Sequence, residues 1–165
     1  MATSKTKREN AEHGFMASTA LADHLQRVLV DLIELASQSK QAHWNVVGHN
    51  FRDLHLQLDE ITASARAHSD VIAERMRALH AVADGRSGTV SKATSLPTYP
   101  QGEVDTAQTV DLITARLEGV TATIRDVHDA VDEEDPTTAD LLHAIIADLE
   151  QFAWMVSAEN RTPSA

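Results

Sequence analysis

The most restrictive feature of this sequence is a long stretch free of helix-breaking residues, since no glycine or proline occurs between Gly48 and Gly85. Within it, apolar side chains recur at intervals of three and four residues: Phe51, Leu54, Leu58, Ile61, Ala65, Ile72, Met76 and Leu79. This spacing predicts one amphipathic helix from an N-cap at Asn50 to about Val82. A helix of this length is typical of a bundle or a subunit interface rather than of a small globular packing.

Three further helices follow from the same periodicity. They span residues 17–46, 106–131 and 135–159. Gly48 is the expected stop after the first of them. Asp135 followed by Pro136 is expected to cap the last.

The segment 84–103, between the second and third long helices, is rich in glycine, proline, serine and threonine. Its apolar stretch 90–96 predicts a short extra helix within a long connection. The predicted fold is therefore all-α, a four-helix bundle over residues 16–160 whose two hairpins are joined by a crossover. Residues 1–15 are expected to form a flexible basic tail and residues 161–165 a short C-terminal tail.

The composition excludes several classes of protein. The chain has 165 residues and no cysteine, which excludes disulfides, thiol catalysis and iron–sulfur clusters. Its net charge of −11 argues against a surface that binds nucleic acid all over, and favours attraction of cations. No apolar run approaches the roughly 18 residues of a membrane helix, and no signal peptide is recognisable. We therefore expect a soluble cytoplasmic protein without a membrane partner.

Four side chains of the longest predicted helix form a candidate metal site: His55, Asp59, Asp70 and Glu74. At about 100° per residue they fall on one face of the helix. However, Asp59 and Asp70 are roughly 16 Å apart along the axis, whereas metal–ligand bonds are near 2.0–2.2 Å. One helix therefore cannot bring all four to one ion, but two antiparallel copies about a twofold axis can. His55 and Asp59 of one copy then face the two acids of the other, across the small residues at 63–67.

His43 is expected to join this set. It continues the apolar stripe of the first helix, and an antiparallel hairpin would place it near His55. Two imidazoles with three carboxylates suit iron(II) and other divalent first-row metals. Acidic residues four apart are more often a solvated helix face, and this alternative stays open for any single pair. The flanking apolar residues Leu54, Leu58 and Ile61 favour the site.

Other chemistry is not indicated. The sequence has no His-Glu-x-x-His, no phosphate-binding glycine loop and no nucleophile elbow. It also has no Glu-x-x-His, the motif with which di-iron carboxylate bundles build a site inside one subunit. The remaining histidines are interpreted as ordinary polar residues, and Asp140 with His143 as a weak surface pair. These are His13, His24, His49, His68, His80, His128 and His143.

The stretch from His43 to Glu74 resembles a known family, the DNA-binding proteins from starved cells (Dps, or miniferritins). The residues that carry the resemblance are Gln41-Ala-His43-Trp44-Asn-Val-Val-Gly48, Phe51, His55, Leu58-Asp59, Ser69-Asp70 and Ala73-Glu74-Arg75. Phe152-Ala-Trp154 is similar to the family's last helix. The resemblance covers the four-helix domain and implies a ferritin-like bundle.

The resemblance implies a hollow shell of twelve subunits with ferroxidase sites at its twofold interfaces. It assigns His43, His55 and Asp59 of one subunit, with Asp70 and Glu74 of its partner, as ligands of one or two irons. Fe(II) would be oxidised to Fe(III), preferably by hydrogen peroxide, and stored as ferric mineral. This would protect the cell and its DNA from oxidative damage.

Trp44 adjoins His43 and is a candidate to quench stray oxidising equivalents or, as an alternative, a core aromatic residue. Iron entry is expected near the junction of the third and fourth helices. The candidate pore acids are Asp132, Glu133, Glu134, Asp135 and Asp140. Twelve copies would carry a formal charge of −132, so contact with DNA would fall to the tail residues Lys5, Lys7 and Arg8.

Two alternatives to the iron-oxidising shell stay open at this point. One is a structural, nucleoid-associated protein that compacts DNA and has little ferroxidase activity. The other is a simple helical interaction module.

Overall fold

The computed structural model describes residues 14–163, which form four long helices, one short helix and two short strands. The helices are α2 (Thr19–Asn45), α3 (Phe51–Ala78), α4 (Ser87–Ala93), α5 (Thr106–Glu134) and α6 (Pro136–Ala158). The strands are β1 (Val46–Val47) and β2 (Val104–Asp105). The all-α prediction is confirmed, and the predicted helix bounds are correct to within a few residues. None of the helices between residues 14 and 163 combines the length and apolarity that a membrane span requires.

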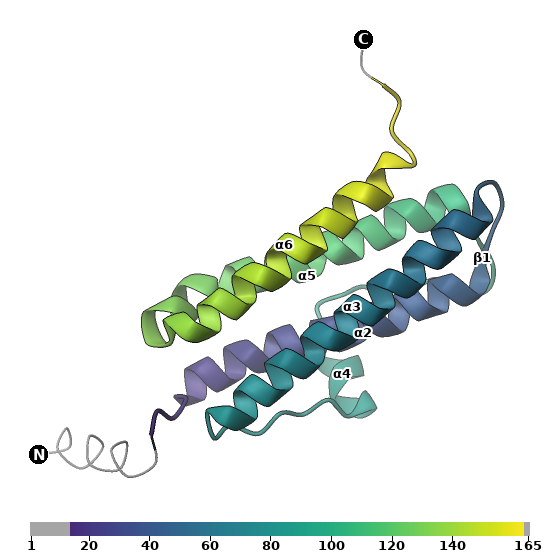
Figure 1. Cartoon of the computed structure of the whole chain (residues 1–165). Helices are drawn as coiled ribbons and strands as arrows, with labels where there is room; N and C mark the ends of the chain where they lie inside the picture. Colours follow the sequence, from purple (N-terminus) through teal and green to yellow (C-terminus); the bar gives the residue numbers. More distant parts are fainter. Residues whose placement is uncertain (1–13, 164–165) are drawn as a thin grey trace, which may run out of the picture.

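Two antiparallel hairpins, α2 with α3 and α5 with α6, pack face to face (Figure 1). The strands β1 and β2 pair in parallel, Val46 with Val104 and Val47 with Asp105, so that α5 begins beside the α2–α3 loop. Because α3 ends at the opposite end of the bundle, residues 79–105 must cross its whole length. This is the predicted crossover, and α4 lies within it on the outside of the bundle, against α2.

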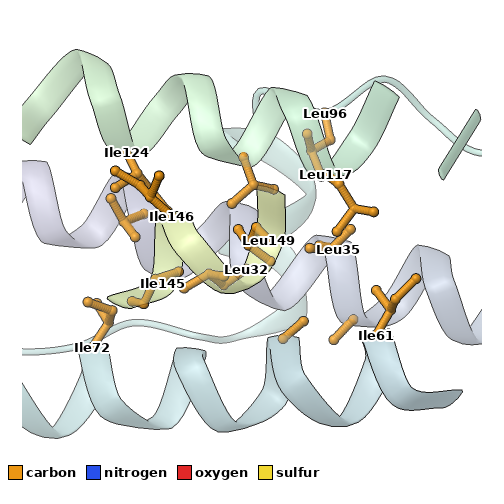
Figure 2. Close-up of a cluster of buried hydrophobic side chains, with 14 of the residues drawn as sticks. Leu32, Leu35, Ile61, Ile72, Leu96, Leu117, Ile124, Ile145, Ile146 and Leu149 are labelled. Atoms are coloured by element: carbon orange, nitrogen blue, oxygen red, sulfur yellow. The ribbon is translucent and has the colours of Figure 1, made fainter. Parts of the chain in front are cut away.

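The interior is built from the apolar stripes of the four long helices. Figure 2 shows Leu32 of α2, Ile61 of α3, Leu117 of α5 and Leu149 of α6 converging on it, with Leu96 reaching in from the crossover. The first four of these side chains are fully buried. Burying a side chain of this size contributes about 1.5–3 kcal/mol, so the stripes dominate the stability of the bundle.

A buried carboxylate, Asp31 of α2, fixes one part of the crossover. It accepts hydrogen bonds from the hydroxyl of Thr94 (2.9 Å), from the backbone N–H (2.8 Å) and hydroxyl (2.6 Å) of Ser95, and from the hydroxyl of Thr123 (2.7 Å). A buried carboxylate needs such donors because it has lost its hydration. Asp31 therefore binds the crossover to both α2 and α5.

A buried guanidinium fixes the next residues of the crossover. Arg116 of α5 donates from Nε to Oε1 of Gln38 (3.0 Å) and from Nη2 to the carbonyls of Pro97 (3.2 Å) and Thr98 (3.3 Å). Burial lowers the pKa of Arg116. Side chains of opposite charge thus hold adjacent parts of one connection against the bundle.

Both predicted N-cap positions are correct, but neither side chain makes the expected capping hydrogen bond. Asn50 precedes α3 but has left-handed backbone geometry (φ 59°), and its side chain donates to Glu159 (2.9 Å) instead of capping. Capping needs an extended backbone at this position, which aims the side chain at the first turn. Asp135 precedes α6 but also makes no capping hydrogen bond, because its carboxylate is engaged elsewhere. Gly48 is not the residue that stops α2, which ends at Asn45 with Val46 in an extended conformation; it lies in the following turn at φ 120°, where a Cβ would lie 3.3 Å from the Thr106 hydroxyl.

Candidate metal centre

His43 and His55 meet at one end of the α2–α3 hairpin. His43 lies in the last turn of α2 and His55 in the second turn of α3, so the antiparallel arrangement brings them to the same height. Their rings stack with centroids 3.7 Å apart and planes 20° apart. The predicted burial of His43 and its proximity to His55 are both confirmed, since His43 is only 8% exposed.

Each imidazole is oriented by the backbone of the other residue. Nδ1 of His43 lies 2.8 Å from the carbonyl oxygen of His55, and Nδ1 of His55 lies 2.8 Å from that of His43. A carbonyl can only accept, so each Nδ1 carries a hydrogen and donates it. Each Nε2 is then a lone-pair donor available to a metal. Hydrogen bonding of the non-ligating nitrogen is the usual way in which metal-binding histidines are oriented.

Asp59 lies one helical turn beyond His55 and is adjacent to the histidine pair. Its Oδ1 lies 3.6 Å from Nδ1 of His43 and forms an ion pair with Lys40 of α2. The hydrogen bond from Lys40 holds the pKa of Asp59 below its ordinary value, and the nearby imidazoles lower it further. The side chain of Asp59 remains 47% exposed, so the carboxylate is ionised and accessible at the surface.

Asp70 and Glu74 are exposed further along α3. Within residues 14–163 of one chain, no three His, Asp or Glu side chains come together as a metal site. The structure therefore places His43, His55 and Asp59 next to one another without closing a metal site, and leaves the other two predicted ligands apart from them. Asp70 borders a groove of about 600 Å³ between α2, α3 and the start of the crossover. Its lining includes the small residues Ala67, Ala73 and Gly85.

Two aromatic residues border the histidines. Trp44 is 68% exposed, so the alternative of a core aromatic is wrong within this chain. Phe51 stacks obliquely on His55, with centroids 5.0 Å apart, and is itself 43% exposed. The apolar stripe of the predicted helix included Phe51, which the structure leaves partly exposed within this chain, and its contact with His55 was not predicted. Its position one helical turn before His55 was the feature that could have indicated the contact.

The candidate pore acids differ in availability. Glu134 accepts from the backbone N–H (2.8 Å) and hydroxyl (2.6 Å) of Ser18, which caps α2. Asp135 is buried and accepts from Arg75 of α3 (2.7 Å). These two carboxylates therefore serve the fold. The others, Asp132, Glu133 and Asp140, are exposed. The basic residues predicted to contact DNA, Lys5, Lys7 and Arg8, lie outside the described residues.

A second stacked pair of histidines was not predicted from the sequence. His128 of α5 and His143 of α6 stack with centroids 4.4 Å apart, and Nε2 of His128 is buried with no hydrogen-bond partner in the described chain. Asp140 lies 3.7 Å from His143, as the surface-pair interpretation expected. Both histidines are equally far from the α5–α6 turn at residues 135 and 136, and this symmetry could have indicated the contact.

The chain is similar in sequence and in structure to several known proteins. Residues 22–162 match the ferritin-like domain family. The DNA protection during starvation protein of Agrobacterium fabrum is 35% identical over 159 residues, which are 96% of either chain. DNA protection during starvation protein 2 of Deinococcus radiodurans is 37% identical over 134 residues, 81% of this chain but only 56% of that relative. The structure of Dps from Microbacterium arborescens in its high-iron form superposes with a TM-score of 0.82 at 29% identity, covering 88% of this chain and 98% of that one.

Proposed function

We propose, from the premise that this chain belongs to the Dps proteins within the ferritin-like family, that it oxidises and sequesters iron as one subunit of a hollow shell. Fe(II) is the substrate, bound between two subunits related by a twofold axis. The alternative of a simple helical module does not account for the paired imidazoles and the acids of α3.

The observation that carries this proposal is the pair of histidines with ionised Asp59 beside them. Their hydrogen-bonded Nδ1 atoms leave both Nε2 atoms as ligands. The missing acids come from a second copy. The pairs His55–Glu74 and Asp59–Asp70 have the same midpoint in the chain, between residues 64 and 65. One twofold axis at that midpoint therefore brings both pairs together.

The ligand set suits the reaction. Imidazole nitrogens bind Fe(II) well, and the carboxylates neutralise the ion and favour the harder Fe(III) product. In the reaction, each of two Fe(II) ions gives one electron to hydrogen peroxide. The O–O bond breaks, two protons are taken up, and two waters form. The oxidised iron then collects as ferric mineral inside the shell.

Exposed apolar residues support a subunit interface on this side of the molecule. Trp44, Val47, Phe51, Leu56 and Val71 are each at least 40% exposed, and all lie at the end of α2 or on α3 and the loop between them. Apolar surface gathered in this way marks a protein–protein contact in a soluble chain. A shell of twelve subunits, built from such twofold dimers, is the assembly that we propose.

Stopped-flow absorbance after mixing with Fe(II) and hydrogen peroxide tests the activity. Replacing His43 and His55 together by alanine is expected to abolish the fast rise of ferric absorbance and to leave the shell assembled by native mass spectrometry. The matched control replaces the exposed histidines His49 and His80 by alanine and should retain the fast phase. Survival of the fast phase in the first variant would refute the site, and its absence in the unmodified protein would refute the activity.

DNA is the second proposed partner, in the cytoplasm, because relatives are named for DNA protection. The acidic chain leaves this contact to the basic residues near its N-terminus. Deleting residues 1–10 is expected to abolish a gel shift that is strong at low salt and weak at high salt. An unchanged shift would remove those residues from the proposal.

A further inference from the structure

The middle of α3 is fastened to α6 by one carboxylate. The hydroxyl of Ser64 and Nε2 of His68 both bind Oδ2 of Asp148, the imidazole at 2.8 Å. An ionised carboxylate only accepts, so both groups of α3 act as donors to the same oxygen. The side chains of His68 and Asp148 are 20% and 37% exposed, so this link sits at the edge of the core rather than inside it.

The remaining side-chain hydrogen bonds that the described structure shows along this side of α3 lie near its ends. They join Asn50 to Glu159 and Arg75 to Thr138 and Asp135. Among residues 14–163, the Asp148 link is the only side-chain hydrogen bond between these two ends that sets the distance from the middle of α3 to α6. Apolar contacts tolerate small lateral shifts, whereas hydrogen bonds weaken steeply with distance and angle.

The Asp148 link lies where the proposed twofold axis crosses α3. Ser64 adjoins the midpoint shared by the two ligand pairs, and His68 follows one turn later. At about 100° per residue, His68 points about 180° away from Asp59 and about 160° away from Asp70. The Asp148 link therefore contacts the face of α3 that lies opposite to the metal ligands.

We propose that Asp148 is a positioning residue for the metal centre, an inference that rests on the proposed function. Through Ser64 and His68 it sets the lateral position of α3 at the crossing. That position sets the gap between His55 and Asp59 of one subunit and the two acids of the other. Functional sites require ligands held within about 0.5 Å of their working positions. Because of the twofold symmetry, a shift of α3 moves the ligands of both subunits, so the width of the gap changes by twice the shift. Groups hydrogen-bonded directly to a metal ligand typically change metal affinity by about 10–100-fold, and Asp148 acts one step further away, so we expect an effect at the low end of this range.

Co(II) titration of the assembled protein, followed by visible absorption, tests this inference. Asp148→Ala is expected to lower Co(II) affinity about tenfold and to change the absorption band of the bound ion. Glu150→Ala is the matched control, because Glu150 lies two residues further along α6 and pairs with Arg125 of α5 instead of α3. It should bind Co(II) as the unmodified protein does.

Variants of the donor separate positioning from general stability. His68→Gln keeps an N–H donor toward Asp148 and should retain most of the Co(II) affinity, whereas His68→Leu should lose it. Ser64→Ala removes one of the two donors to Asp148, and it replaces Asp148→Ala in the test if that variant does not assemble. The Co(II) affinity of Ser64→Ala should fall by a smaller factor.

Unchanged Co(II) affinity and absorption in Asp148→Ala, or in Ser64→Ala where it serves instead, would overturn the inference and leave the proposed function intact. If replacing His43 and His55 leaves Co(II) binding unchanged, or if the unmodified protein binds no Co(II), the proposed function fails, and this inference fails with it.

Discussion

At the residue scale, the candidate centre holds a cation of its own. Lys40 donates to Oδ1 of Asp59, one of the two oxygens with which this carboxylate could bind a metal ion, and this hydrogen bond is the largest cause of the lowered pKa of Asp59. A lowered pKa keeps this carboxylate ionised and ready to bind in mildly acidic solution. The ammonium group opposes binding of a divalent ion here, because the two cations repel each other and share one carboxylate.

Replacing Lys40 by alanine is therefore expected to raise Co(II) affinity at pH 7 severalfold. The gain should shrink as pH falls, because Asp59 then protonates at a higher pH than in the unmodified protein. Isothermal titration calorimetry at several pH values would measure both effects, with Lys92→Ala, an exposed lysine on α4, as the control. Affinity that falls on removal of Lys40 would show that the lysine assists binding instead of competing with the metal.

A second residue, Asp135, links stability to pH. Burial raises the pKa of its carboxyl, but hydrogen bonds from Thr138 and Arg75 outweigh burial and hold the pKa below its ordinary value. Its contribution is therefore present above the pKa of the unfolded chain, about 3.9, and is lost as pH falls through the lower pKa of the folded state. Asp135→Asn should cost about 2 kcal/mol at pH 7 and flatten the loss of stability in acid. Urea unfolding at pH 7 and near pH 3 measures both effects. The control is Asp129→Asn, at a fully exposed residue, which should neither lower stability at pH 7 nor change its loss in acid.

At the element scale, α3 ends in a motif that calls for glycine. His80 has left-handed backbone geometry (φ 64°), its N–H donates to the carbonyl of Arg77 (3.1 Å), and the N–H of Ala81 donates to the carbonyl of Met76 (2.9 Å). This pattern is a Schellman motif, in which a side chain at the left-handed position adds strain. Backbone hydrogen bonds therefore end α3 at this position, although His80 is unfavourable in the left-handed conformation that the motif requires.

His80→Gly is accordingly expected to stabilise the protein by about 1 kcal/mol, measured as a rise in the urea midpoint at constant slope. The comparison variant is Asn50→Gly, at the other left-handed position next to α3. It should gain less or lose stability, because asparagine tolerates this geometry and its side chain binds Glu159. Equal gains at the two positions would contradict the role assigned to the Asn50 side chain.

At the scale of the whole molecule, the proposed metal centre requires close approach of two copies of α3. Ala63 is exposed in the single chain and lies next to the proposed axis, which places it opposite residue 66 of the second copy, so a large side chain added there meets that copy. Helices that pack closely lie 8–10 Å apart, which leaves no room for two large side chains at a crossing.

Ala63→Trp is expected to dissociate the assembly into smaller species and to lower Co(II) affinity at least tenfold, with the melting temperature of the free chain nearly unchanged. Native mass spectrometry and Co(II) titration measure the two effects. Ala20→Trp, an exposed alanine in the first turn of α2, is the control. An intact assembly with full metal affinity in Ala63→Trp would place the axis elsewhere.

Sequence analysis predicted the bundle well because helix periodicity is a local property. The apolar stripe of α3, the breakers around Gly48 and Gly85, and the crossover all follow from neighbours in the chain. The proximity of His43 and His55 could be predicted because both lie close to one tight turn. The positions of the caps at Asn50 and Asp135 were predicted correctly, but their side chains make no capping hydrogen bond, because that bond depends on backbone angles, which residue type alone does not decide.

By itself, then, the sequence determined the helices, their inward faces and the spacing of the acids from which we propose a second copy. Only the tertiary structure decided what each polar group is bonded to: Lys40 at Asp59, Arg75 at Asp135, and two donors from α3 at Asp148. The physical reason is range. Periodicity arises between residues within one or two turns, whereas these hydrogen bonds join residues 19 to 84 positions apart. Their partners are set by the relative register of packed helices, which no local pattern encodes.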